Sequence, residues 1–92
     1  MSKIYYQVLL YYKYVKIDDP ERFRSDQLNL CEKLNLKGRI IIASEGINGT
    51  VEGYIRDIEK YIKVLTRDPR FTDIHFKKSS GDGNTFPKLF LF

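Results

Sequence analysis

The chain has 92 residues, of which 42% are hydrophobic and 14% aromatic, and this predicts one folded domain with a modest core. Its formal net charge of +4 is compatible with a polyanionic partner but does not demonstrate one. No apolar run approaches the roughly 20 residues that cross a membrane, no secretory signal pattern is legible, and the single cysteine, Cys31, has no internal disulfide partner. We therefore expect a cytoplasmic protein without membrane contact.

A strand and a helix are predicted in the first third of the chain. Residues 4–15 are rich in tyrosine, valine and leucine, and alternation divides them into two apolar faces, which is typical of a central strand. Residues 18–21 then supply a capping aspartate, a proline at the first helical position and an acid in the first turn. Apolar residues follow at helical spacing as far as Leu34, and Gly38 is expected to end this helix.

A β-hairpin is predicted next. Ile40-Ile41-Ile42 is a short β-branched run of the kind found in buried strands. Asn48-Gly49 is a strong tight-turn dipeptide, and residues 50–52 alternate as a returning strand would. Glu45 would then lie where the buried strand ends, a position at which rigid scaffolds often present functional groups. A hairpin with turn chemistry and no further role is the alternative interpretation.

The remaining segments predict a helix, a strand and an extended end. Apolar residues recur every three or four positions after Tyr54, and Asp68-Pro69 should end this second helix. Residues 73–78 alternate as a fourth strand, and residues 79–84 resemble a flexible polar loop. The chain finishes in four consecutive large apolar residues, 89–92, and we expect more polypeptide to follow them rather than a segment packed back on the domain.

This order of elements predicts an α+β, ferredoxin-like βαββαβ sandwich. Its four-stranded antiparallel sheet would have the first and third strands at the centre and two helices on one face. The other face would be open to a partner, another domain or a second copy. We assign residues 1–80 to the ferredoxin-like domain and residues 81–92 to a C-terminal loop and extended segment.

Several motifs together resemble one known family. They are residues 37–51, residues 8–14, Asp68-Pro69-Arg70-Phe71, and Lys77-Lys78-Ser79-Ser80 followed by residues 86–89. In this order they resemble the rhodanese-domain tRNA uridine hydroxylases, formerly an uncharacterised family, over essentially the whole chain. The resemblance implies an acylphosphatase-like N-terminal domain that precedes a rhodanese domain. It also implies oxygen-dependent hydroxylation of the wobble uridine by the full-length enzyme, with the tRNA anticodon region and the rhodanese domain as partners.

The residues in this chain do not indicate catalysis, and we expect this segment alone to be non-catalytic. The rhodanese domain that carries the family's catalytic cysteine loop is not in this sequence, and Cys31 has the spacing of a core residue in the first helix. His75, the only histidine, is expected at the surface. We find no metal-ligand spacing and assign no cofactor. Acylphosphatase chemistry is rejected because residues 14–20 carry acid where a phosphate would bind.

Nucleic-acid binding is the function that the residues favour. Alternate tyrosines on the open face could stack unpaired bases, while lysine and arginine hold phosphates. The candidate substrate-binding residues are Glu45, Asn48, Lys13, Arg39, Lys77 and Lys78, and Lys37 and Lys88 could extend the basic area. Glu45 and Asn48 are expected to face a cleft shared with the rhodanese domain.

Other interpretations stay open at this point. The tyrosines could pack against the rhodanese domain instead of RNA. The chain could be a self-associating module that dimerises through the open face or the C-terminal strand, or a small-ligand regulatory domain.

Overall fold

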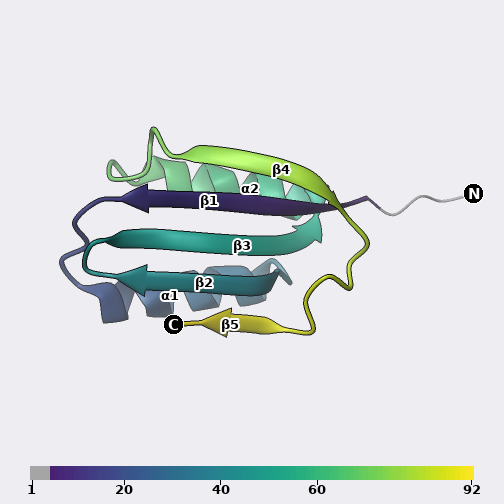
Figure 1. Ribbon diagram of the computed structural model, residues 1–92, viewed down its shortest axis with the longest axis horizontal. Helices are drawn as coiled ribbons and strands as arrows, with labels where there is room; N and C mark the ends of the chain where they lie inside the picture. Colours follow the sequence, from purple (N-terminus) through teal and green to yellow (C-terminus); the bar gives the residue numbers. More distant parts are fainter. Residues whose placement is uncertain (1–4) are drawn as a thin grey trace, which may run out of the picture.

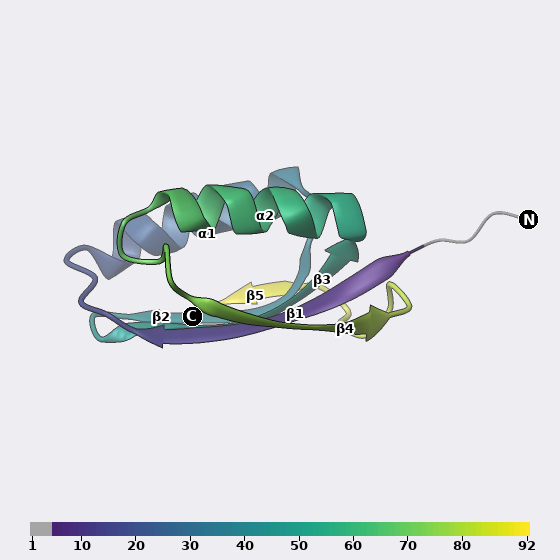
Figure 2. The same cartoon turned by 90° about the horizontal axis from the view of Figure 1, so that it is seen from above.

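The computed structural model describes residues 5–92, which form a five-stranded sheet with two helices lying on one of its faces (Figures 1 and 2). In chain order the elements are β1 (Tyr6–Tyr14), α1 (Pro20–Lys33), β2 (Lys37–Ala43), β3 (Gly46–Tyr54), α2 (Ile55–Arg67), β4 (His75–Gly81) and β5 (Leu89–Leu91). The ferredoxin-like prediction is confirmed in its element order and its layers. The predicted beginning of β1 at residue 4 lies outside the described residues.

The sheet has the strand order β4-β1-β3-β2-β5, so β1 and β3 are central, as predicted (Figure 1). The prediction of four strands was wrong, because residues 89–91 add β5 parallel to the free edge of β2. The Gly38 N–H donates to the Lys88 carbonyl at 3.1 Å, and the Phe92 N–H donates to the Ile40 carbonyl at 2.9 Å. The extended segment is therefore part of this fold. Residues 79–81 also belong to β4, not to a loop.

The predicted turn at Asn48-Gly49 was also wrong. Ser44 and Glu45 form the turn, Ala43 pairs with Gly46, and Asn48 and Gly49 lie within β3. Gly49 is opposite Tyr11, whose aromatic ring fills the space that a Cβ would take. A glycine is needed at this position because the Tyr11 ring of the neighbouring strand β1 packs directly against its backbone.

The expected start of α1 and the expected end of α2 are confirmed, but the expected end of α1 is not. The Asp19 carboxylate accepts a hydrogen bond from the Arg22 N–H at 3.1 Å and caps α1. This helix ends at Lys33, well before Gly38, because Asn35 takes a left-handed conformation with φ of 55°. Gly38 instead lies in β2. The end of α2 before Asp68-Pro69 is confirmed.

The core lies between the sheet and the helices and contains a short chain of polar groups. The hydroxyls of Tyr11 and Tyr61 are 2.5 Å apart, and Tyr61 donates to the Gln27 side-chain oxygen at 2.6 Å. Cys31 is fully buried in this core, which confirms its structural assignment. Burial raises the pKa of the Cys31 thiol to about 12, so a thiolate does not form there at neutral pH.

Candidate functional site

The sheet has one face covered by the helices and one open face (Figure 2). Neighbouring residues of each strand point to different faces. In β1, Tyr11 is only 3% exposed beneath the helices, whereas Tyr12 is 67% exposed on the open face. His75 pairs with Tyr12 across β4 and β1 and is exposed, as predicted. The alternating tyrosines of β1 are therefore available on the open face.

The exposed strand positions of the open face combine cationic and apolar side chains. The cations on or beside these strands are Lys37, Arg39, Lys77 and Lys88. The exposed apolar side chains are Leu10, Tyr12, Tyr14, Ile41, Tyr54, Phe90 and Phe92. Glu52 is the one acid at these strand positions, and it is only 2% exposed. The accessible part of this surface is therefore electropositive, as a polyanion-binding surface requires.

The Glu52 carboxylate is occupied by hydrogen bonds from the segment that connects β4 and β5. It accepts hydrogen bonds from the Gly83 N–H at 3.1 Å, from the Thr85 N–H at 3.0 Å and from the Thr85 hydroxyl at 2.8 Å. Gly81 has no side chain to collide with this carboxylate. The carboxylate therefore holds the connecting segment in place and is not presented to a ligand.

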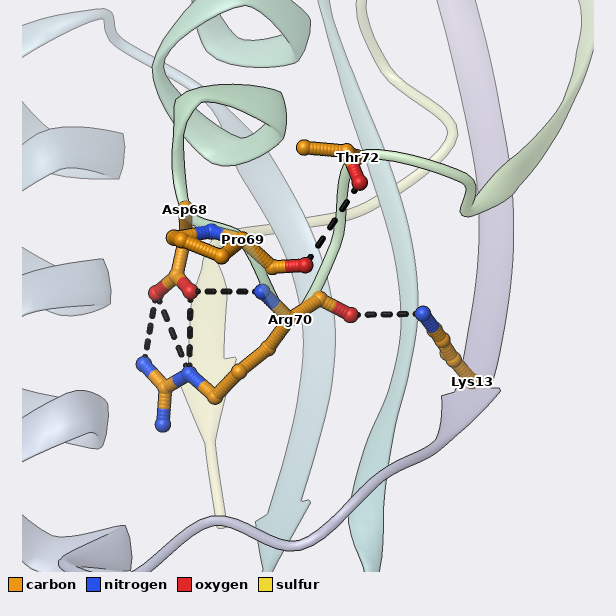
Figure 3. A network of polar contacts seen from close by, with 5 residues as sticks. All are labelled: Lys13, Asp68, Pro69, Arg70 and Thr72. Carbon is orange, nitrogen blue, oxygen red and sulfur yellow. Dashed lines mark hydrogen bonds and ion pairs between the residues drawn. The ribbon is translucent and has the colours of Figure 1, made fainter.

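Lys13 and Lys78, two of the predicted binding residues, project toward the helix-covered side instead. The Lys13 ammonium donates to the Arg70 carbonyl at 2.6 Å (Figure 3). It also pairs with the Asp73 carboxylate, whose pKa it lowers. Lys78 pairs with Glu59 of α2 at 2.7 Å. Alternation turns both side chains toward the covered side, where their ammonium groups are engaged. Lys13 therefore adds no free cation beside the open-face tyrosines, and Lys78 does not extend the basic area of that face.

The Asp68-Pro69-Arg70-Phe71 motif is a structural connection between α2 and β4. The Arg70 guanidinium makes two-point contact with the Asp68 carboxylate, at 2.6 Å for its shortest hydrogen bond (Figure 3). This pairing holds the pKa of Asp68 below its usual value. The same guanidinium lies over the rings of Phe23 and Phe71, 4.9 and 5.3 Å from their centroids. These contacts fix the loop whose carbonyl binds Lys13.

Glu45 and Asn48 do come together, at the end of the open face near the β2–β3 turn. Both line a small hollow of about 180 Å³, together with Tyr12, Tyr14 and Ile41. Arg39 and Lys77 lie on the same face, two residues along their strands from Ile41 and His75, which flank Tyr12 and Asn48. Sequence reasoning overlooked Ile41 and Phe92 as members of this surface, although alternation along β2 places Ile41 there.

Comparison with known families supports this picture of the fold. Residues 6–91 match the family described as the UPF0176 acylphosphatase-like domain. This chain belongs to that family. Among its relatives are the tRNA uridine(34) hydroxylases of Bacillus velezensis, 52% identical, and Enterococcus faecalis, 50% identical. Each alignment covers 94% of this chain and 27% of the relative, so the chain spans about a quarter of the length of these proteins.

Solved structures with the same fold include acylphosphatases. That of Bacillus subtilis is 14% identical with a TM-score of 0.68, covering 98% of this chain and 99% of the enzyme. That of Coxiella burnetii is 13% identical with a TM-score of 0.67, covering 97% and 94%. At this identity the likeness shows the fold alone.

In this member of the UPF0176 acylphosphatase-like family, the segment between β1 and α1 is engaged with the β2–β3 turn. The Val15 and Ile17 N–H groups donate to the Glu45 and Ser44 carbonyls at 3.0 and 2.8 Å. Two backbone donors that could face an anion are thereby used internally. Within residues 5–92 there is no cluster of three or more potential metal ligands. Over the same residues, neither helix has the length and hydropathy of a membrane span.

Proposed function

We propose that this chain is the N-terminal, non-catalytic domain of a tRNA uridine(34) hydroxylase, and that its open face binds the anticodon region of the tRNA. The relatives named above support the enzyme class. The observation that carries the binding role is the composition of the open face, where exposed aromatic and cationic side chains occur together and the one acid at its strand positions, Glu52, is buried. Such surfaces stack bases and neutralise phosphates.

A non-catalytic role agrees with the state of the only thiol. Cys31 is buried, and its raised pKa opposes the thiolate that nucleophilic or redox chemistry needs. The reaction would then take place on the rhodanese domain of the same enzyme. Exposed aromatic groups on and beside β5 support docking of that domain at this edge of the same face, since Phe90 and Phe92 are 38% and 55% exposed.

Lys77 and Lys78 provide a matched test of RNA binding by the open face. They are adjacent in β4, but Lys77 lies on the open face while Lys78 pairs with Glu59 of α2. Binding of this chain to an anticodon stem-loop RNA would be measured by fluorescence anisotropy over a range of salt concentrations. We expect Lys77→Ala to weaken binding and to reduce the salt slope by about one, and Lys78→Ala to leave the slope nearly unchanged.

Two results would contradict this proposal. One is the absence of salt-dependent RNA binding by the wild-type chain. The other is an equal effect of the two lysine substitutions, which would mean that the open face has no special part in binding. Concentration-dependent self-association without RNA affinity would favour a structural module that pairs with a second copy.

A further inference from the structure

The strand register arranges the open face in rows that run across the strands. The strands β4, β1, β3 and β2 lie side by side (Figure 1). Their successive partners His75, Tyr12, Asn48 and Ile41 form a row that we call the Asn48 row. Lys77, Leu10, Thr50 and Arg39 form the next row, which we call the Arg39 row. The two rows are two residues apart along each strand, roughly 6.6 Å. The Asn48 row thus lies beside a row that has a cation at each end, Lys77 on β4 and Arg39 on β2.

The hollow near the β2–β3 turn is built over the Asn48 row. Its volume of about 180 Å³ is below the range of drug-sized ligand pockets, roughly 300–1,000 Å³, and suits a single small ring system. The Tyr12 and Tyr14 rings in its wall are 6.2 Å apart in an edge-on arrangement and present aromatic surface for stacking. The Asn48 amide offers both a donor and an acceptor, and it has no hydrogen-bond partner among residues 5–92.

The charges around the hollow favour one orientation of a bound nucleotide. Glu45 lines it at the turn and places a carboxylate where a phosphate would be repelled. Lys13 also lines it, but its ammonium is already engaged by the Arg70 carbonyl and the Asp73 carboxylate. On the opposite side, the Arg39 row contributes the cations Lys77 and Arg39. A nucleotide would therefore be favoured with its base in the hollow and its phosphate over the Arg39 row.

We propose that this hollow binds one unpaired nucleobase of a single-stranded RNA segment. The inference rests on the proposed RNA-binding function and adds the place and the chemistry of base contact. Tyr12 stacks on the base, and the Asn48 amide hydrogen-bonds to the polar edge of the base. Each nucleobase has a donor and an acceptor on its polar edges, and the amide can present its own pair in either order. Asn48 therefore detects a base without selecting which one.

The test compares two labelled oligomers with equal phosphate charge. One is a seven-nucleotide single-stranded RNA, and the other is a matched oligomer of seven abasic ribose phosphates. We expect the wild-type chain to bind the RNA about 5- to 100-fold more tightly, the range that stacking of one base provides. Tyr12→Ala and Asn48→Ala should each reduce this ratio, while the affinity for the abasic oligomer and the salt slope stay unchanged.

Matched control substitutions are available elsewhere on the surface. Tyr5→Ala and Asn29→Ala remove exposed side chains of the same types from outside the hollow and should not change the ratio. Thermal unfolding of each variant would confirm that it is folded.

The outcomes separate this inference from the function on which it rests. Equal binding of both oligomers, with Lys77→Ala still weakening binding, would overturn the base site and leave the proposed function standing. An equal loss for both oligomers in Asn48→Ala and Tyr12→Ala would likewise overturn it, since those residues would then act on the backbone. Binding of neither oligomer would overturn both proposals.

Discussion

Tyr11 and Tyr12 are neighbours in β1, yet Tyr11 is 3% exposed beneath the helices and Tyr12 is 67% exposed on the other side of the sheet. Lys78 and Lys77 show the same contrast in β4, because only Lys78 has an acidic partner among the described residues. The Tyr11 hydroxyl and the Lys78 ammonium on the covered face are used in internal contacts, whereas Tyr12 and Lys77 on the open face are exposed. The comparison teaches that composition alone does not identify a binding surface in this fold, and that the position of each residue within its strand does.

The largest predicted effect is the protection of the Cys31 thiol, on the covered side of the sheet, from a thiol reagent. The thiol lies in the covered core, where it is fully buried and its pKa is raised to about 12. We expect a thiol reagent at mildly alkaline pH to modify the native chain at least about 10³-fold more slowly than the denatured chain, because reaction requires unfolding. Fast modification of the native chain would show that the covered side opens and would break the comparison.

Substitutions at two adjacent residues of β3, one on each face, should differ in their effect on the free energy of unfolding. A Cβ at Gly49 would collide with the Tyr11 ring, which its hydrogen bond to Tyr61 holds in place. Gly49→Ala should therefore lower the free energy of unfolding by about 1–3 kcal/mol. Asn48→Ala, on the open face, should change it by less than about 0.5 kcal/mol. Urea unfolding measures both, and similar losses in the two variants would contradict the assignment of faces.

A smaller loss of stability is predicted for the ion pair of Asp68 with Arg70, and this loss depends on pH. The pKa of Asp68 is lowered in the folded state, so its stabilising effect is complete above the unfolded pKa of about 3.9 and is lost as pH falls through the folded value. Near pH 6 we expect Asp68→Asn to cost about 0.5–1 kcal/mol, a modest value because the Arg70 side chain is 35% exposed.

Thermal unfolding of this variant and the wild type over a pH series checks the sign. The difference in their stabilities should narrow as pH falls below about 4. A difference that stays constant down to pH 2 would show that the Asp68 carboxylate is not the group responsible.

Local signals in the sequence predicted much of the fold. Asp19 caps α1, Asp68-Pro69 ends α2, and the apolar spacing around Cys31 places it in the core. These features depend on residues within a few positions of one another. Alternation also separated Lys13 from the even-numbered tyrosines, so its position on the covered side was available from the sequence and was overlooked.

The features that could not be predicted depend on contacts between distant segments. Gly49 is required by the ring of Tyr11, and a glycine after an asparagine is indistinguishable by sequence from a turn glycine. The true turn, Ser44-Glu45, lacks glycine and gives a weak signal. The fifth strand depends on the connection that Glu52 holds, and a glutamate in an alternating strand ordinarily predicts exposure.

The addition of β5 also determines whether the edge strands of the sheet can pair with an extended segment of another chain. One outer strand is only three residues long, and the other carries adjacent lysines at its centre. Short or charged margins are poor templates for a further strand, which protects a protein from edge-to-edge aggregation. A second molecule would therefore find little backbone to pair with, and contacts between copies would have to form through side chains on the broad surface of the sheet.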